Sequence, residues 1–104
     1  MMPRPTMPSG LALTRTTPEF DETTVPRALL AAHTVAPEVW GRLCVRAGCV
    51  RFVFEADPSI GIELSAGEHI DIPPREPHRV EPLRGARFVV EFYRKPANQS
   101  APER

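Results

Sequence analysis

The chain lacks the features that mark several large classes of protein. It has only two cysteines among 104 residues, Cys44 and Cys49, which are too few for a disulfide scaffold and do not have the spacing of a metal-binding pair. We therefore expect two reduced thiols. No apolar run approaches the roughly 18 residues that a membrane-spanning helix requires. The first ten residues hold no apolar stretch after Arg4, unlike a signal peptide. We expect a cytoplasmic protein that binds no membrane.

An excess of charge is also absent. Thirteen basic and thirteen acidic side chains give a formal net charge of zero. Binding of nucleic acid through counterion release needs a clear basic excess, so we expect no nucleic-acid partner. The length allows one domain only, and a hydrophobic fraction of 41% is ordinary for a globular protein.

Proline is the residue in clear excess. Thirteen prolines make up about 12% of the chain, against a usual value of about 5%. Residues 1–10 and 97–104 contain prolines but few apolar side chains, which predicts two disordered tails around a domain at residues 11–96. The interior prolines lie between apolar runs, as expected if each marks a turn or the end of a strand.

Alternation of apolar and polar residues predicts six short strands, at residues 41–46, 50–54, 60–64, 69–72, 78–81 and 86–93. Between the first two, Ala47-Gly48 predicts a tight hairpin turn, since glycine supplies the positive φ that such turns need. Only residues 26–33 have helical character, with a proline in the first turn followed by alanines and leucines. Short strands with one short N-terminal helix indicate an all-β sandwich or barrel.

One spacing narrows the architecture. Gly67, Pro73 and His78 reproduce the spacing of the second cupin motif, G-x5-P-x-G-x2-H-x3-N, whereas Arg75 and Pro82 replace its second glycine and its asparagine. In this motif the glycine turns the chain into a strand, the proline ends that strand, and the histidine starts the next one facing inward. Of the first cupin motif, a closing hairpin and one nearby histidine remain, and its glutamate is missing.

A longer likeness runs from about residue 14 to residue 96. Its most telling parts are the helix ending in His33, the strand entry Val39-Trp40-Gly41-Arg42-Leu43, the Pro-x3-His78 turn and the terminal Glu91-Phe92-Tyr93. These segments resemble the small cupin-like family of the tellurite-resistance protein B N-terminal domain and the stand-alone YeaR-like proteins. The resemblance implies a cupin-like jelly roll, a bacterial cytoplasmic setting and a link to tellurite or toxic-anion stress. In the two-domain relatives, methyl transfer belongs to a separate Rossmann-like domain, which this chain is too short to contain.

The histidines are the main candidates for chemistry. The resemblance places His33 near the first-motif histidine and His78 on the second-motif one. Imidazoles together with a carboxylate form a cupin-type metal site, and Glu91 on the last strand is the best carboxylate to complete it. We therefore predict a site for a divalent metal ion (zinc, iron, nickel or manganese) at His33, His78 and Glu91. His69 alternates with two isoleucines and is expected on the outer face, with Asp71 as neighbouring surface charge.

Two alternatives stay open at this site. If Phe88, Val90 and Phe92 face the interior, Glu91 points the other way and cannot bind the metal. The simpler interpretation of His78 is a histidine that caps a turn and hydrogen-bonds to a neighbour.

Other side chains also have a functional and a structural interpretation. Trp40 lines a ligand cavity or, as is commoner for a lone tryptophan at a strand start, belongs to the core. Three arginines, Arg42, Arg46 and Arg51, share one polar alternation of the predicted hairpin. They can gather an oxyanion such as tellurite or phosphate, although a solvated or dimer-facing surface is commoner. The same arginines can lower the pKa of Cys44 and make it a reactive thiol, although a quiet surface cysteine is the commoner outcome.

Two functional hypotheses follow. The first is a non-catalytic cupin-like domain that binds a metal, a small molecule or an anion and serves a stress response. We expect it to be a homodimer, because pairing covers exposed sheet edges. The second is a metal-dependent cupin enzyme, an oxygenase or isomerase acting on a small organic substrate. Enzymatic cupins usually carry three histidines and a glutamate, so the incomplete first motif favours binding.

Overall fold

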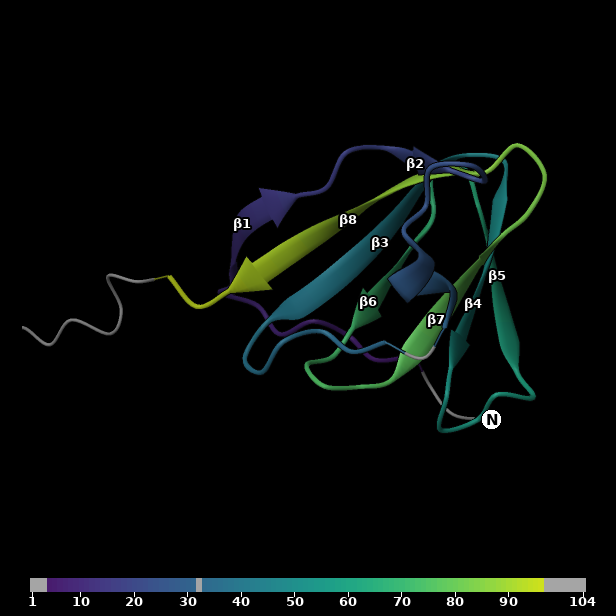
Figure 1. Cartoon of the computed structure of the whole chain (residues 1–104). Helices are drawn as coiled ribbons and strands as arrows, with labels where there is room; N and C mark the ends of the chain where they lie inside the picture. The colour runs from purple at the N-terminus through teal and green to yellow at the C-terminus, as the bar shows by residue number, and fades with distance from the viewer. Residues whose placement is uncertain (1–3, 32, 97–104) are drawn as a thin grey trace, which may run out of the picture.

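Two antiparallel sheets make up the fold (Figure 1). The structure is a computed structural model that describes residues 4–31 and 33–96. The larger sheet has the order β1 (Ala12–Thr16), β8 (Arg87–Arg94), β3 (Trp40–Ala47) and β6 (His69–Ile72), with β2 (Phe20–Asp21) also pairing with β8. The smaller sheet has the order β5 (Gly61–Ser65), β4 (Cys49–Phe54) and β7 (His78–Pro82). The predicted all-β class is confirmed, and the described strands form two sheets without closing into a barrel.

The predicted helix at residues 26–33 is reduced to one short 3₁₀ helix, η1 (Arg27–Leu30). Pro26 precedes it in an extended conformation. Soon after it, His33 exchanges two backbone hydrogen bonds of 2.8 Å with His78. The chain must be extended at that bridge, so the helical segment cannot run to residue 33 as predicted.

The turn after β3 has the predicted backbone but not the predicted role. Gly48 has a φ of 65°, as expected for glycine in a tight turn. However, β3 pairs with β6 and β8, whereas β4 pairs with β5 and β7. The turn therefore carries the chain from one sheet to the other instead of closing a hairpin. As a consequence, Arg42 and Arg46 lie on a different sheet from Arg51, and the three arginines do not form one patch.

The core fills the space between the sheets. On β3 the buried residues alternate, with Leu43 and Val45 facing inward. Their partners on β8, Val90 and Phe88, are also buried. From the smaller sheet, Phe52 and the other inward residues of β4, β5 and β7 close the layer. The residues between these buried ones, such as Arg42 and Cys44, point to the opposite side of the larger sheet, which we call the outer face.

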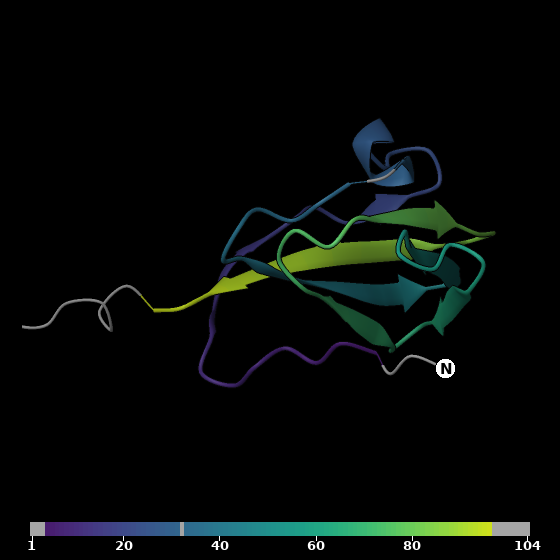
Figure 2. The ribbon, with the colours of Figure 1, turned by 90° about the horizontal axis from the view of Figure 1, so that it is seen from below.

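The N-terminal segment, residues 4–10, runs along the outer face of the larger sheet (Figure 2). These residues belong to the first predicted tail, yet the backbone N–H of Met7 donates a 2.9 Å hydrogen bond to Asp71 on β6. The second predicted tail, residues 97–104, lies outside the described residues. Within the described part of the chain, no helix is long and apolar enough to cross a membrane.

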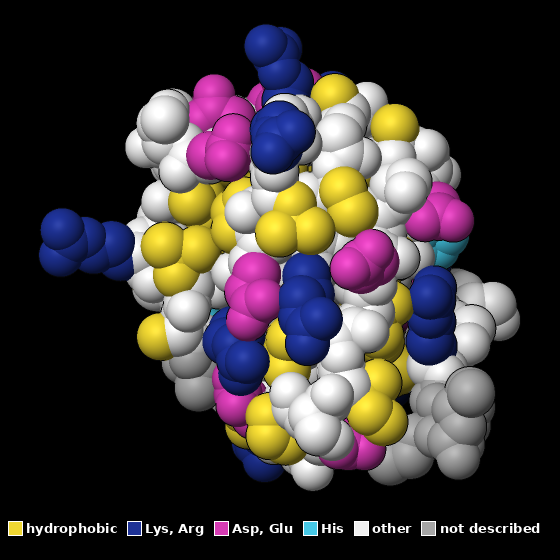
Figure 3. Space-filling view, turned by 90° about the vertical axis from the view of Figure 1, so that its right-hand side faces the viewer, with side chains coloured by type: hydrophobic (Ala, Val, Ile, Leu, Met, Phe, Trp, Pro, Cys, Tyr) yellow, Lys and Arg dark blue, Asp and Glu magenta, His cyan; other side chains and the backbone are white. Residues whose placement is uncertain are grey.

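The solvent side of the smaller sheet is covered by ion pairs. Arg79 contacts Glu55 at 2.8 Å and Glu81 at 3.1 Å, and Arg51 contacts Glu81 at 3.2 Å. Figure 3 shows basic and acidic side chains next to each other on this side of the molecule, between hydrophobic patches. The solvated interpretation of Arg51 therefore holds, because its charge is already neutralised by a neighbour.

Candidate functional site

The structure brings His33 and His78 together at one edge of the smaller sheet. Besides their backbone bridge, the two imidazole rings lie 5.6 Å apart between centroids, in an edge-to-face arrangement. On its other side, the His78 ring stacks on Phe52, with centroids 5.3 Å apart and planes 16° from parallel. The pair is thus held by both backbone and ring contacts.

His78 is buried in a neutral form. The residue is 2% exposed, and Nδ1 lies 2.9 Å from the carbonyl oxygen of Glu76. Because a carbonyl only accepts, Nδ1 carries the proton and Nε2 keeps its lone pair. Burial lowers the pKa of His78, and the neighbouring His33 lowers it further, although the hydrogen bond to Glu76 opposes the shift. The turn contact expected from the simpler interpretation is therefore present.

Glu91 lies away from this pair. Its neighbour Val90 is in the core, so Glu91 faces the outer side, where it accepts a 2.7 Å hydrogen bond from the Tyr93 hydroxyl. The parity alternative is therefore the one that the strand adopts. Among the described residues, no three histidine, cysteine, aspartate or glutamate side chains are grouped so as to hold a metal ion.

An ion pair between Arg42 and the buried carboxylate of Asp71 lies on the outer face. Arg42 Nε donates to Asp71 Oδ1 at 2.6 Å, and Nη2 donates to Oδ2 at 3.3 Å. Asp71 is 6% exposed, so its expected role as surface charge is wrong. Burial raises the pKa of this carboxyl, but the bonds from Arg42 and Met7 outweigh that effect and lower it. The Arg42 guanidinium also lies over the Tyr93 ring, 5.5 Å from its centroid.

Two further candidate residues, Cys44 and Trp40, also lie on the outer face. Burial and the neighbouring Glu91 raise the pKa of the Cys44 thiol to about 11, despite Arg42 and Arg46. The thiol is therefore protonated near neutral pH, which fits the quiet interpretation. Trp40 is half-buried on the outer face in register with Tyr93, so it does not belong to the core.

A pocket of about 590 Å³ opens at the end of the smaller sheet, between the β4–β5 connection and the N-terminal segment. Phe54, Ile60 and Ile62 give it an apolar floor. Around them stand four charged side chains, Arg4, Asp57, Glu63 and Glu76. We call this the acidic pocket.

The acidic pocket adjoins the histidine pair. Phe54 pairs in register with His78 and packs edge-to-face on Phe52, with centroids 4.9 Å apart. Glu76, also in the wall, supplies the carbonyl that contacts His78. Sequence reasoning did not find this pocket, because its walls come from separate segments that share no local pattern.

Comparisons with known proteins identify a matching domain family and two similar crystal structures. The profile of the TehB-like domain family matches residues 15–90. A crystal structure of an Escherichia coli K12 protein, a structural-genomics target, has a TM-score of 0.80 and 28% identity, covering 88% of this chain and 97% of that one. The crystal structure of TehB from Haemophilus influenzae has a TM-score of 0.77 and 24% identity, covering 86% of this chain but 33% of TehB. The chain thus spans about a third of TehB. No curated protein sequence matches it.

Proposed function

The chain belongs to the TehB-like domain family, and from this premise we propose that it is a non-catalytic cytoplasmic domain that binds a small organic molecule in the acidic pocket. This family is related to tellurite resistance, and we propose that binding serves that kind of stress response. The ligand class that suits the pocket has an apolar body and a cationic group.

The acidic pocket is the observation that carries this proposal. Its volume of about 590 Å³ is within the range of roughly 300–1,000 Å³ usual for small-molecule sites. Three carboxylates, Asp57, Glu63 and Glu76, face one guanidinium, Arg4. A ligand with a positive charge complements this excess, and an oxyanion is repelled by it. The apolar floor supplies most of the binding free energy, and the acidic wall selects the sign of the charge.

A finer relation to cupins belongs to the same proposal. Gly67 has a φ of 90°, β6 ends at Ile72 directly before Pro73, and His78 is the first residue of β7. These positions agree with the order of turn, strand end and strand start in the second cupin motif, which supports this part of the proposal. The 97% coverage of the Escherichia coli protein supports a relation to stand-alone members of the cupin-like family such as the YeaR-like proteins.

The test is an amide NMR titration with phenethylamine, which combines an aromatic ring with an ammonium group. We expect saturable shifts around Ile60 and Ile62. The matched anion 3-phenylpropionate should leave these signals unchanged. Ile60→Gln should weaken phenethylamine binding about fivefold, since about 1 kcal/mol of apolar burial is lost. Leu83→Gln, which alters an exposed leucine outside the pocket, is the control. Equal shifts with both probes, or unchanged affinity in Ile60→Gln, would contradict the proposal.

The histidine pair favours a second candidate function, binding of a divalent metal ion. Two imidazoles 5.6 Å apart supply two of the four ligands that zinc usually takes, and a metal-dependent enzyme would need this site. Since Glu91 lies on the other face, the remaining ligands would be water or substrate. Elemental analysis of the purified chain after incubation with zinc, iron, nickel or manganese tests this. Near-stoichiometric metal that is lost in His33→Ala supports the site, and absence of metal from the native chain removes it.

A further inference from the structure

A second pocket lies at the opposite end of the larger sheet from the β3–β4 turn, where β3 begins and β8 ends. It has a volume of about 630 Å³. Its apolar walls include Trp40, Leu11 and Pro74, and three charged residues, Glu38, Arg94 and Lys95, stand around it. We call this the tryptophan pocket. It shares no lining residue with the acidic pocket.

The charges of the tryptophan pocket have no partners among the described residues. Within that part of the chain, neither Arg94 nor Lys95 lies within ion-pair distance of a carboxylate, and Glu38 contacts no cation. On the sheet faces, Arg42, Arg51 and Arg79 are paired with carboxylates, whereas Arg46 has no such pair among these same residues. Two cations and one anion therefore give the pocket a net positive charge that the protein does not neutralise locally.

Among the described residues other than glycine, only Glu38 and Arg75 have a positive φ, and Glu38 lines this pocket. Glu38 has a φ of 67°, in the left-handed region that residues with a Cβ rarely adopt. It lies in the turn closed by the hydrogen bond from the Val39 N–H to the Ala36 carbonyl, directly before β3. Such strained residues are concentrated at functional sites, where the surrounding structure holds them in place. Glu38 lines the pocket, and its carboxylate is opposite in sign to the two cations.

We propose that the tryptophan pocket binds a small organic anion with a carboxylate and an apolar body. The carboxylate would be held by Arg94 and Lys95, since a guanidinium forms charge-assisted bonds to this group. The apolar body would lie against Trp40 and the neighbouring proline and leucine walls. Glu38 repels a second negative charge, so it selects monoanions over dianions. The chain thus has two pockets of opposite charge preference.

Trp40 makes this proposal directly measurable. It is the only tryptophan of the chain, so tryptophan fluorescence reports on this pocket and not on the acidic one. The probe is 3-phenylpropionate, titrated into the full chain. We expect a saturable change in fluorescence that weakens as salt is added, because the carboxylate contacts are exposed to screening. Phenethylamine, with the same ring and chain length but an ammonium group, should give no saturable change.

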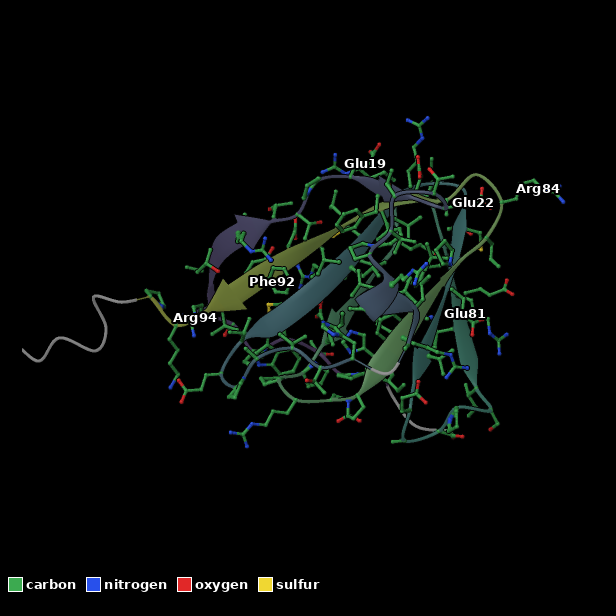
Figure 4. The ribbon with its side chains drawn as sticks, viewed as in Figure 1. Glu19, Glu22, Glu81, Arg84, Phe92 and Arg94 are labelled. Atoms are coloured by element: carbon green, nitrogen blue, oxygen red, sulfur yellow. The ribbon has the colours of Figure 1, made fainter. Side chains whose placement is uncertain are left out.

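Variants that remove charges test whether Arg94 and Lys95 hold the anion. Arg94→Gln combined with Lys95→Gln should weaken the affinity for 3-phenylpropionate about tenfold, as expected for lost charge-assisted bonds. Both residues are exposed, so folding should be unaffected. Arg84→Gln is the matched control, since Figure 4 shows Arg84 at the far end of the molecule from Arg94. Glu38→Gln should tighten binding.

The fluorescence titrations can either support or overturn the proposed anion site. A saturable response to 3-phenylpropionate that is lost with the two cations and kept in Arg84→Gln supports the site. No saturable response, an equal response to phenethylamine, or unchanged affinity without the two cations overturns it. Because the acidic pocket is tested by NMR with the opposite probe, either proposal can fail while the other stands.

Discussion

Replacing Asp71 with asparagine should destabilise the protein by removing the charge that organises the outer face. The carboxylate accepts both Arg42 bonds and the Met7 N–H bond, and it is almost fully buried. Asparagine has the same shape, keeps one acceptor oxygen and creates no cavity. Because both oxygens of the carboxylate accept hydrogen bonds and the amide NH2 only donates, the variant removes the charge together with the bonds to one of the two oxygens.

The size of the effect follows from these contacts. Hydrogen bonds that involve a charged group contribute about 1.5–3 kcal/mol each, whereas neutral ones contribute about 1 kcal/mol. Arg42 is 29% exposed, so it can regain some hydration when its partner loses charge, which reduces the loss. We expect Asp71→Asn to lower the free energy of unfolding by about 1–3 kcal/mol. For a domain of this length, that lowers Tm by roughly 5–15 °C.

The pH dependence gives an independent check. The pKa of Asp71 in the folded state is below its ordinary value, which is about 3.9 in an unfolded chain. A carboxyl with a depressed pKa contributes stability that is fully present above the unfolded pKa and is lost as pH falls through the folded pKa. The difference in Tm between wild type and Asp71→Asn should therefore be constant from about pH 7 to pH 5 and shrink below about pH 4.

Thermal unfolding followed by circular dichroism measures both quantities. Glu63→Gln is the control, because it removes the charge of an exposed carboxylate that has no ion pair among the described residues. If Asp71→Asn unfolds at the wild-type temperature at pH 7, the buried pair is not stabilising. If the difference persists unchanged at pH 2, the carboxylate is not the source of it. Either result refutes the reasoning.

Two further predictions concern the sheet crossing and the thiol. A Cβ on Gly48 would lie 2.4 Å from the backbone of Gly85, whereas one on Gly67 would meet nothing within 4 Å, and both glycines have positive φ. Gly48→Ala should therefore cost about 1–3 kcal/mol more than Gly67→Ala, and equal Tm values for the two variants would disprove the close approach. Cys44 should resist alkylation by iodoacetamide at pH 7.5 and become reactive as pH approaches 11. Mass spectrometry of a Cys49→Ser variant measures this, and rapid modification at pH 7.5 would contradict the raised pKa.

The strands could be predicted from the sequence because their pattern is local. Alternation of burial along β3 and β8 follows the alternation of apolar residues. The same alternation predicts that Glu91 points away from the core if Val90 points into it. The assignment of each strand to a sheet was not local. Nothing near Gly48 indicates that its turn connects two sheets, because that outcome depends on β3 pairing with β8, some forty residues later in the chain.

In the candidate sites, too, features with a local sequence pattern were predictable and features that depend on distant residues were not. His33 and His78 were expected together because a known motif spacing links them, whereas the burial of Asp71 was missed. Its partner Met7 is 64 residues away and lies in a proline-rich segment whose composition predicts disorder. The residues that line each pocket come from four separate segments of the chain, so neither pocket has a sequence signature.

The N-terminal segment connects the buried ion pair to both pockets. Arg4 and Pro5 line the acidic pocket, and Pro8 lines the tryptophan pocket. Between them, Met7 is fixed by Asp71. Substitutions inside one pocket should therefore weaken one probe only, whereas Asp71→Asn should weaken phenethylamine and 3-phenylpropionate together, because it loosens a wall that the pockets share. If Asp71→Asn lowers Tm yet both probes bind with wild-type affinity, the segment contributes to stability without shaping either pocket.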